Sequence, residues 1–168
     1  MELLEKVTQY LIDHELVMAS AESCTAGLIV SELARVPGSG QAIDCGLAVY
    51  SPNAKHRYLG VSFDTIERYG LTSEETSRAM ALGALDNNEA DLAIANTGIA
   101  GPEPHDGIPV GTVCFAWAFR HAGQVYVYTR TRRFSGDRNE VRLAAAHHAL
   151  EQVPQLHREV LEGKAPPV

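Results

Sequence analysis

The chain has 168 residues, of which 45% are hydrophobic and 21% charged, and its formal net charge is −7. This length and composition predict one globular domain with a sizeable core and exclude a disordered chain. The acidic balance excludes generic binding to nucleic acid, which needs a broad positive surface. No apolar run approaches the roughly 20 residues of a membrane-spanning helix, so we expect neither a nucleic-acid partner nor a membrane.

The N-terminal stretch MELLEKVTQYLIDHE carries acidic residues early and lacks a basic start and a cleavage site. We therefore expect no signal peptide and a cytoplasmic location. The cysteines Cys24, Cys45 and Cys114 are odd in number and widely spaced. That pattern favours reduced thiols over a disulfide framework or a zinc site.

In the first half of the chain, apolar residues recur with the spacing of a helix in some stretches and of a strand in others, and these stretches alternate. Helical spacing predicts helices over 3–14 and 28–36, and short apolar runs predict strands over 15–21 and 44–51. Ser51 followed by Pro52 predicts the start of a further helix, and Gly60 its end. A shorter helix is expected between Asp64 and Gly70.

In the second half, Thr72 with Glu75 has capping-box spacing and predicts a helix through about residue 85. The run 91–98 predicts a strand that enters the loop 99–109, and 110–120 with 124–133 predict a β-hairpin. Asp137 with Glu140 repeats the capping-box spacing and predicts a helix through about residue 152. We expect the ordered chain to end near Pro154.

This order of elements predicts an α/β fold: a single domain, 1–168, with a mixed β-sheet and helices on both faces, in three α/β/α layers. Ordered structure is expected over about 3–153, with a tail at 160–168. Ligands of such sheets usually bind beyond the C-terminal ends of strands. The loops after Ala21, Tyr50 and Asn96 therefore qualify as parts of a site.

The stretch AESCTAG, residues 21–27, lies between a predicted strand and a predicted helix. Glu22, Ser23 and Thr25 at such a junction can simply cap the helix or help to bind an anion. The same geometry can present Ser23 as a nucleophile beside backbone N–H groups that stabilise an oxyanion. Cys24 is the rival nucleophile, although such thiols are often only buried.

A serine nucleophile needs a base, and no Ser-x-x-Lys or G-x-S-x-G motif supplies one here. Lys55 is the only lysine in the body of the chain and follows a predicted strand that ends near Tyr50. If it is desolvated, its amine can lose a proton near neutral pH and act as the base. The alternative interpretations are that Lys55 is an exposed lysine on a helix and that Tyr50 is a strand aromatic packed into the core.

The stretch NTGIAGPEPHDG, residues 96–107, contains Gly98 and Gly101. It is either an ordinary tight turn or a backbone path that brings N–H groups close to a ligand. His105 and Asp106 lack a second pair at metal-ligand spacing, so no metal site is expected.

A basic segment occupies residues 130–142 of this acidic chain. Its arginines are Arg130, Arg132, Arg133, Arg138 and Arg142. The segment is either a solvated strand edge with a capped helix or a phosphate site, because arginine binds phosphate through two parallel hydrogen bonds.

The motifs AESCTAG, VYSPNAK, NTGIAGP, PVGTV and FSGDRNEVR occur in this order. Together they resemble the CinA carboxy-terminal family, also called the PncC family of nicotinamide-nucleotide amidohydrolases, over roughly residues 3–152. The resemblance implies deamidation of nicotinamide mononucleotide to nicotinate mononucleotide and ammonia in pyridine-nucleotide salvage, with no cofactor. Many relatives carry a larger N-terminal domain related to molybdopterin-binding proteins. The motifs of this chain correspond to the C-terminal domain alone, so we expect a stand-alone form.

Matching these motifs residue by residue implies Ser23 as nucleophile, Lys55 as base and Thr97 as a further catalytic group. Tyr50 is matched as well, and we expect it to help hold or relay the proton. Arg138 is implied as the phosphate contact. The remaining expected substrate contacts are Cys24, Thr25, Gly98 and Gly101.

The chain departs from the family pattern at two places. Ala26 stands where the family usually has glycine, and Ile108 stands where it usually has lysine, in the altered loop 103–108. The alternatives to an amidase for the mononucleotide are therefore a weak or inactive nucleotide-binding module and an amidase for another amide. Tyr126 and Tyr128 on the hairpin suit either a homo-oligomer contact or a cover for the sheet.

Overall fold

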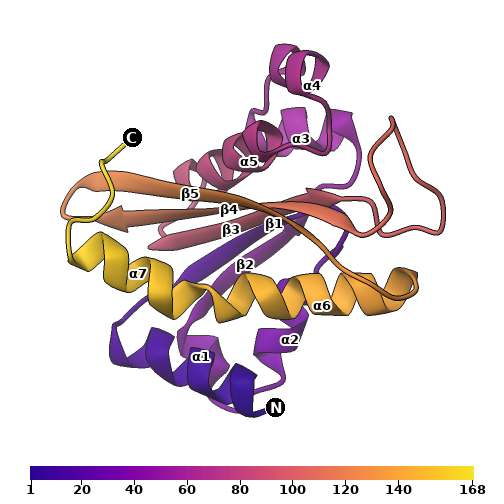
Figure 1. Cartoon of the computed structure of the whole chain (residues 1–168). Helices are drawn as coiled ribbons and strands as arrows, with labels where there is room; N and C mark the ends of the chain where they lie inside the picture. The colour runs from indigo at the N-terminus through magenta and orange to yellow at the C-terminus, as the bar shows by residue number, and fades with distance from the viewer.

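Five strands form one mixed sheet in the order β2-β1-β3-β4-β5 in the computed structural model, which describes residues 1–168 (Figure 1). β1 (Met18–Glu22) pairs in parallel with β2 (Ile43–Ala48) and with β3 (Leu92–Gly98). The predicted hairpin, β4 (Thr112–His121) and β5 (Gln124–Arg133), continues the sheet in antiparallel pairing. The mixed α/β sheet expected from the sequence is thus confirmed.

One face of the sheet is covered by four helices, which lie below it in Figure 1. They are α1 (Glu2–Asp13), α2 (Leu28–Ala34), α6 (Arg138–Glu151) and α7 (Val153–Leu161). The larger hydrophobic core lies between these helices and the sheet, with Trp117, Phe115 and Phe119 among its largest buried side chains. Trp117 remains satisfied there because its indole N–H donates to the Ala149 carbonyl of α6 at 2.8 Å.

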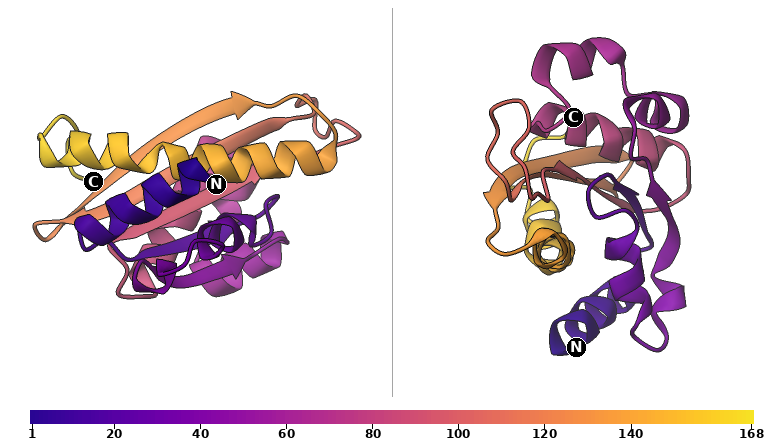
Figure 2. Two further views of the ribbon diagram at one scale, coloured as in Figure 1. Left: turned by 90° about the horizontal axis from the view of Figure 1, so that it is seen from below. Right: turned by 90° about the vertical axis from the view of Figure 1, so that its right-hand side faces the viewer.

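The opposite face is covered by α3 (Pro52–Leu59), α4 (Phe63–Tyr69) and α5 (Glu74–Asp86). The right-hand view of Figure 2 shows the two helical layers on opposite sides of the sheet. The core under α5 is smaller, and alanines supply most of its sheet side: Ala21, Ala93, Ala95, Ala116 and Ala118. Short side chains let α5 approach the sheet closely.

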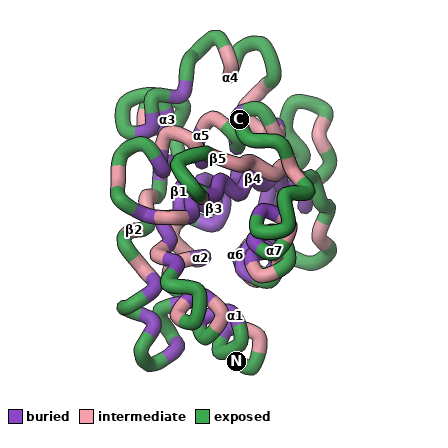
Figure 3. The backbone as a smooth tube through the Cα atoms, turned by 90° about the vertical axis from the view of Figure 1, so that its left-hand side faces the viewer, coloured by how far each residue is buried: buried purple, intermediate pink, exposed green.

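The strands differ in burial according to their place in the sheet, as Figure 3 shows. β1 is buried at every residue and β3 at all but its last, whereas the edge strand β2 alternates between partly buried and exposed residues. This is the usual difference between a central strand covered on both faces and an edge strand. None of the helices is long and apolar enough to cross a bilayer.

Two capping predictions are confirmed and one is shifted. The Ser51 hydroxyl accepts from the Ala54 N–H at the start of α3, and Asp137 forms the full capping box with Glu140. Thr72, in contrast, does not cap α5. The cap is Ser73, which accepts from the Thr76 N–H. α5 begins one residue later than predicted.

The expectation that ordered structure ends near Pro154 is wrong. Pro154 lies in the first turn of α7, where a missing N–H costs no hydrogen bond. α7 buries Val153, Leu156 and Val160 in the larger core. This packing keeps the chain helical beyond Pro154, which the proline signal alone did not predict. The C-terminal Val168 N–H donates to the Val125 carbonyl of β5 at 2.7 Å.

Candidate active site

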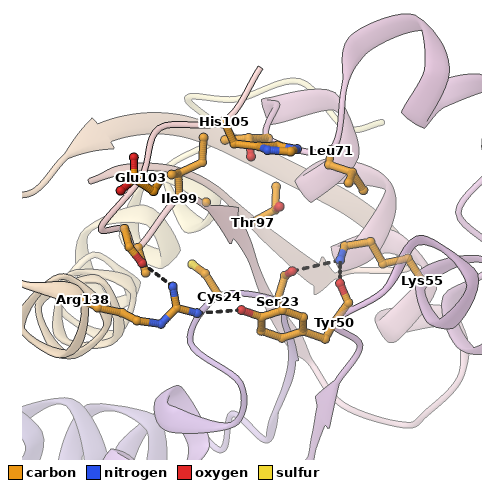
Figure 4. A pocket seen from close by; sticks show the side chains of 14 residues that line it. Ser23, Cys24, Tyr50, Lys55, Leu71, Thr97, Ile99, Glu103, His105 and Arg138 are labelled. Atoms are coloured by element: carbon orange, nitrogen blue, oxygen red, sulfur yellow. Dashed lines mark hydrogen bonds between the residues drawn. The ribbon is translucent and has the colours of Figure 1, made fainter. Parts of the chain in front are cut away.

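A cavity of about 360 Å³ opens where the loops after β1, β2 and β3 meet the start of α6 (Figure 4). These loops meet because the parallel strands end at the same edge of the sheet. The cavity is lined by nearly all the residues predicted for the site: Ser23, Cys24, Tyr50, Lys55, Thr97, Gly98, Gly101 and Arg138. Thr25 is the exception.

Lys55 and Ser23 meet inside this cavity. The Lys55 Nζ atom lies 2.9 Å from the Ser23 Oγ atom, and the lysine side chain is 1% exposed. The same Nζ donates to the carbonyl oxygens of Val49 at 2.9 Å and Tyr50 at 2.7 Å. The Ser51 cap fixes the first turn of α3 and so holds the amine beneath these two carbonyls. The lysine is therefore not the exposed helix lysine of the alternative interpretation.

Lys55 and Cys24 are the two titratable groups beside Ser23. Burial shifts the pKa of both, and it makes the lysine more reactive and the cysteine less reactive. It lowers the pKa of the Lys55 amine to about 8, because the charged ammonium loses its hydration. It raises the pKa of the Cys24 thiol to about 12, because here the charged form is the thiolate. Near neutral pH the lysine can supply an uncharged amine, whereas the cysteine stays protonated.

The turn that carries Ser23 is organised by Glu22, which is fully buried. Its carboxylate accepts from the hydroxyls of Ser20 and Thr25, each at 2.6 Å. It also accepts from the N–H groups of Ile29 at 2.8 Å and Val30 at 3.3 Å. Of the three residues expected as possible caps, Glu22 caps α2, whereas Ser23 and Thr25 do not.

Thr25 does not line the cavity, so the expected substrate contact is wrong. Its side chain is fully buried, donates to Glu22 and accepts from the Asn96 amide at 2.8 Å. Asn96 also accepts from the Cys24 thiol, at 3.6 Å. Thr25 therefore helps to fix the turn from behind. Ala26, with φ of 49°, and Gly27, with φ of 98°, complete the turn in the left-handed region.

Tyr50 and Arg138 bridge the other side of the cavity. The Arg138 guanidinium donates to the Tyr50 hydroxyl at 3.1 Å and to the Gly101 carbonyl. Tyr50 lies beyond the end of β2 and is 55% exposed, so it is not a core aromatic. Its hydroxyl contacts Arg138, and only its carbonyl contacts Lys55 (Figure 4). This geometry does not support the expected proton relay through the phenol.

Some backbone N–H groups near Ser23 are already used. The Ser23 N–H donates to the Asn96 carbonyl at 3.1 Å, and the Ile99 N–H donates to the Thr112 carbonyl at 2.9 Å. The N–H groups of Cys24 and Ala100, both in residues that line the cavity, bind no acceptor in the chain. Gly101 also lines the cavity and its N–H likewise binds no acceptor in the chain, so Cys24, Ala100 and Gly101 are candidate donors for an oxyanion.

Sequence reasoning missed two groups of residues. The first supports the turn: the Arg142 guanidinium of α6 donates to the carbonyls of Cys24 at 2.9 Å and Thr25 at 3.2 Å. Arg142 lies one helical turn after Arg138, so both arginines are on the same face of α6. This spacing is the sequence signal that could have placed Arg142 near the site. The second group lines the cavity and comprises Leu71 and Thr72; Glu103 and His105, which also line it, belong to the loop 103–108 already singled out by its departure from the family pattern. Leu71 belongs to no motif, and the capping-box spacing of Thr72 indicated a helix start rather than a site residue.

The sequence matches a known family and known proteins over most of its length. The sequence model of the CinA C-terminal domain matches residues 1–157. The chain is 46% identical over 132 residues to "Nicotinamide-nucleotide amidohydrolase PncC" of Enterobacter agglomerans, covering 78% of this chain and 79% of that protein. It is 39% identical over 155 residues to "Protein YdeJ" of Escherichia coli, covering 92% of this chain and 88% of that protein.

Other relatives are much longer. A "Putative competence-damage inducible protein" of Caldicellulosiruptor saccharolyticus is 41% identical over 150 residues, which are 89% of this chain but 36% of that protein. The chain thus spans about a third of the length of some curated relatives and most of the length of others.

Solved structures agree with the sequence comparison. A competence or damage-inducible protein from Enterobacter asburiae superimposes with a TM-score of 0.84 at 42% identity, covering 90% of this chain and 94% of that one. A competence damage-inducible protein A from Klebsiella pneumoniae gives a TM-score of 0.85 at 36% identity, covering 92% and 94%. Shared fold, shared motifs and a match over nearly the whole length show that this chain belongs to the CinA C-terminal domain family.

Proposed function

We propose that this chain hydrolyses the carboxamide of nicotinamide mononucleotide, giving nicotinate mononucleotide and ammonia through a serine–lysine mechanism. The activity named for the Enterobacter agglomerans relative supports the reaction class. The observation that carries the mechanism is the buried Lys55 Nζ atom, 2.9 Å from the Ser23 Oγ atom in a cavity.

The contacts of Lys55 suit a general base. An uncharged amine has two N–H bonds and one lone pair, and the carbonyls of Val49 and Tyr50 accept the two N–H bonds. The lone pair is then directed at the Ser23 hydroxyl. When the amine takes the serine proton, its third N–H donates to the same oxygen. The base therefore stays anchored in both protonation states.

Acylation begins when Lys55 removes the Ser23 hydroxyl proton and the Oγ atom attacks the carboxamide carbon. The N–H groups of Cys24 and Ala100 stabilise the negative oxygen of the tetrahedral intermediate. Lys55 then gives its proton to the leaving nitrogen, the C–N bond breaks, and ammonia departs. The remaining ester joins the Ser23 oxygen to the nicotinoyl carbon.

Deacylation repeats the sequence with water. Lys55 takes a proton from the water as its oxygen attacks the ester carbon, and then returns that proton to the Ser23 oxygen as the ester bond breaks. Nicotinate mononucleotide leaves and the enzyme is restored. Thr97 lines the cavity near the reacting groups and is 3% exposed, so we assign it to positioning the ring.

Arg138 is our assignment for the 5′-phosphate. A guanidinium has five N–H donors, and the hydrogen bonds to Tyr50 and Gly101 use two of them. The remaining donors leave room for a phosphate contact at the end of the cavity away from Lys55. The same two bonds hold the guanidinium in place before the substrate binds, which reduces the entropy lost on binding.

The decisive experiment compares ammonia release from nicotinamide mononucleotide by the wild type and by Lys55→Met, with ligand binding measured separately by calorimetry. We expect the variant to bind the mononucleotide and to lose at least about a hundredfold in rate, which is the usual contribution of a general base. Comparable rates in the two proteins would overturn the role of Lys55. Binding without turnover by the wild type would instead favour a nucleotide-binding module, and turnover of other amides alone would favour a different amidase.

A further inference from the structure

Arg142 of α6 holds the turn that carries Ser23 from outside the cavity. Its Nε atom donates to the Cys24 carbonyl at 2.9 Å, and its two terminal nitrogens donate to the Thr25 carbonyl and to the Asn139 side chain, each at 3.2 Å. The residue is partly buried, forms no salt bridge and does not line the cavity. A positive charge that no carboxylate balances is therefore fixed against two peptide carbonyls.

The hydrogen bonds of the turn fix the peptide group that joins Ser23 to Cys24. The Ser23 N–H donates to the Asn96 carbonyl, and the Ser23 carbonyl accepts from the Ala26 N–H, each at 3.1 Å. Arg142 holds the next two carbonyls along the chain. Turning the peptide group would strain these bonds, so the Cys24 N–H keeps one orientation although it binds no acceptor. An N–H group held in this way is preorganised, because it needs no reorientation when an oxyanion forms.

The charge of Arg142 acts at the same place. Burial raises the pKa of the Cys24 thiol to about 12, and the positive charge of Arg142 opposes this rise by favouring the thiolate. Arg142 therefore stabilises negative charge beside the Cys24 backbone. A tetrahedral intermediate that accepts from the Cys24 N–H carries its negative oxygen in this region, where a charge fixed before the reaction stabilises it.

We propose that Arg142 is a positioning residue for the oxyanion, an inference that rests on the proposed function. It orients the Cys24 N–H and adds a fixed positive charge behind the turn. The amide oxygen of the bound substrate carries only a partial charge, whereas the oxygen of the tetrahedral intermediate carries a full one. Arg142 should therefore act mainly on kcat, because its effect is larger in the transition state than in the bound substrate.

Two substitutions separate the hydrogen bonds of Arg142 from its charge. Arg142→Met removes both, whereas Arg142→Lys keeps a positive charge but loses the planar fork that binds two carbonyls. Arg78→Met on α5 is the matched control, because Arg78 is exposed, forms no salt bridge and does not line the cavity.

The diagnostic measurement compares nicotinamide mononucleotide with its thioamide, in which sulfur replaces the carboxamide oxygen. Both substrates release ammonia, but sulfur is a much weaker hydrogen-bond acceptor than oxygen. Loss of an oxyanion donor should therefore slow hydrolysis of the amide more than that of the thioamide. A displaced Ser23 hydroxyl would slow both reactions equally. Binding of the mononucleotide is measured separately by calorimetry in a Ser23→Ala background.

We expect Arg142→Met to lower kcat for the amide about ten- to hundredfold and kcat for the thioamide less than about threefold. The calorimetric affinity should stay within about twofold, since the bound substrate has no oxyanion. Arg142→Lys should give a smaller loss for the amide, and Arg78→Met should match the wild type.

An unchanged kcat in Arg142→Met, or an equal loss for the amide and the thioamide, would overturn the inference. If Arg142→Met does not fold, Arg142→Lys carries the same comparison. Ammonia release by the wild type reports separately on the proposed function. Turnover by the wild type without an amide-selective loss in the Arg142 variants removes only this inference, whereas absence of turnover by the wild type removes both.

Discussion

Gly83 of α5 lies directly against the Leu59 carbonyl at the end of α3: a Cβ atom at position 83 would come within 1.9 Å of that oxygen. The contact lets α3 pack closely on α5. Because α3 also carries Lys55, the absence of a side chain at position 83 helps to set where the amine lies relative to Ser23.

Gly83→Ala should therefore destabilise the protein, even though alanine is favoured over glycine by about 1 kcal/mol within a helix. The obstructing atom belongs to the backbone and cannot rotate away, so we expect a net loss of about 2 kcal/mol in urea denaturation. Gly40→Ala is the control, because nothing lies within 4 Å of a Cβ atom there. A Gly83→Ala variant as stable as the wild type would show that α3 shifts freely.

The pH dependence of acylation should follow the Lys55 amine. Burial lowers its pKa from 10.5 to about 8, so the protonated form, which cannot act as a base, dominates below about pH 8. Single-turnover rates should rise about tenfold per pH unit below that value and level off above it. Lys55→Arg should be inactive throughout, because a guanidinium stays charged. A flat profile between about pH 6 and about pH 9 would contradict the mechanism.

Cys24 should prove dispensable for catalysis. Burial raises the pKa of its thiol to about 12, so almost no thiolate is present at neutral pH. We expect Cys24→Ala to retain most of the ammonia-release activity. In mass spectrometry after brief iodoacetamide treatment, the half-buried Cys45 should be labelled before Cys24. Rapid labelling of Cys24 that also stops turnover would argue for a thiol nucleophile.

Tyr50→Phe distinguishes a proton relay from a structural bridge. The variant removes the hydroxyl that Arg138 contacts but keeps the carbonyl that holds Lys55. We therefore expect KM for the mononucleotide to rise a few-fold, since Arg138 loses one of its anchors, and kcat to stay within about threefold of the wild type. A large fall in kcat with unchanged KM would restore the relay.

Glu22→Gln should unfold more easily than the wild type. Glutamine keeps one acceptor oxygen, but its amide nitrogen cannot accept from the donors that the second carboxylate oxygen binds, Ser20 and Val30. Leaving such groups unsatisfied in a buried site costs about 2 kcal/mol. Glu2→Gln on the surface of α1, which loses only an exposed ion pair, should be nearly neutral in the same denaturation experiment.

The sequence alone determined the class of fold and the region of the site. Alternating strand and helix periods predict the sheet because hydrophobic periodicity reflects which face of an element is buried. Cap signals such as Asp137 with Glu140 are equally local, since donor and acceptor lie within one turn. The position of strand ends then indicated which loops carry the polar side chains.

Only the tertiary structure decided which of these side chains meet. Lys55 and Ser23 are 32 residues apart, and Arg142 reaches a carbonyl 118 residues away. It also showed that Thr25 faces Glu22 rather than the cavity, and that Pro154 begins a helix. Local propensity does not predict such contacts, because the packing of whole helical layers against the sheet sets which side chains are buried and how far apart remote segments lie.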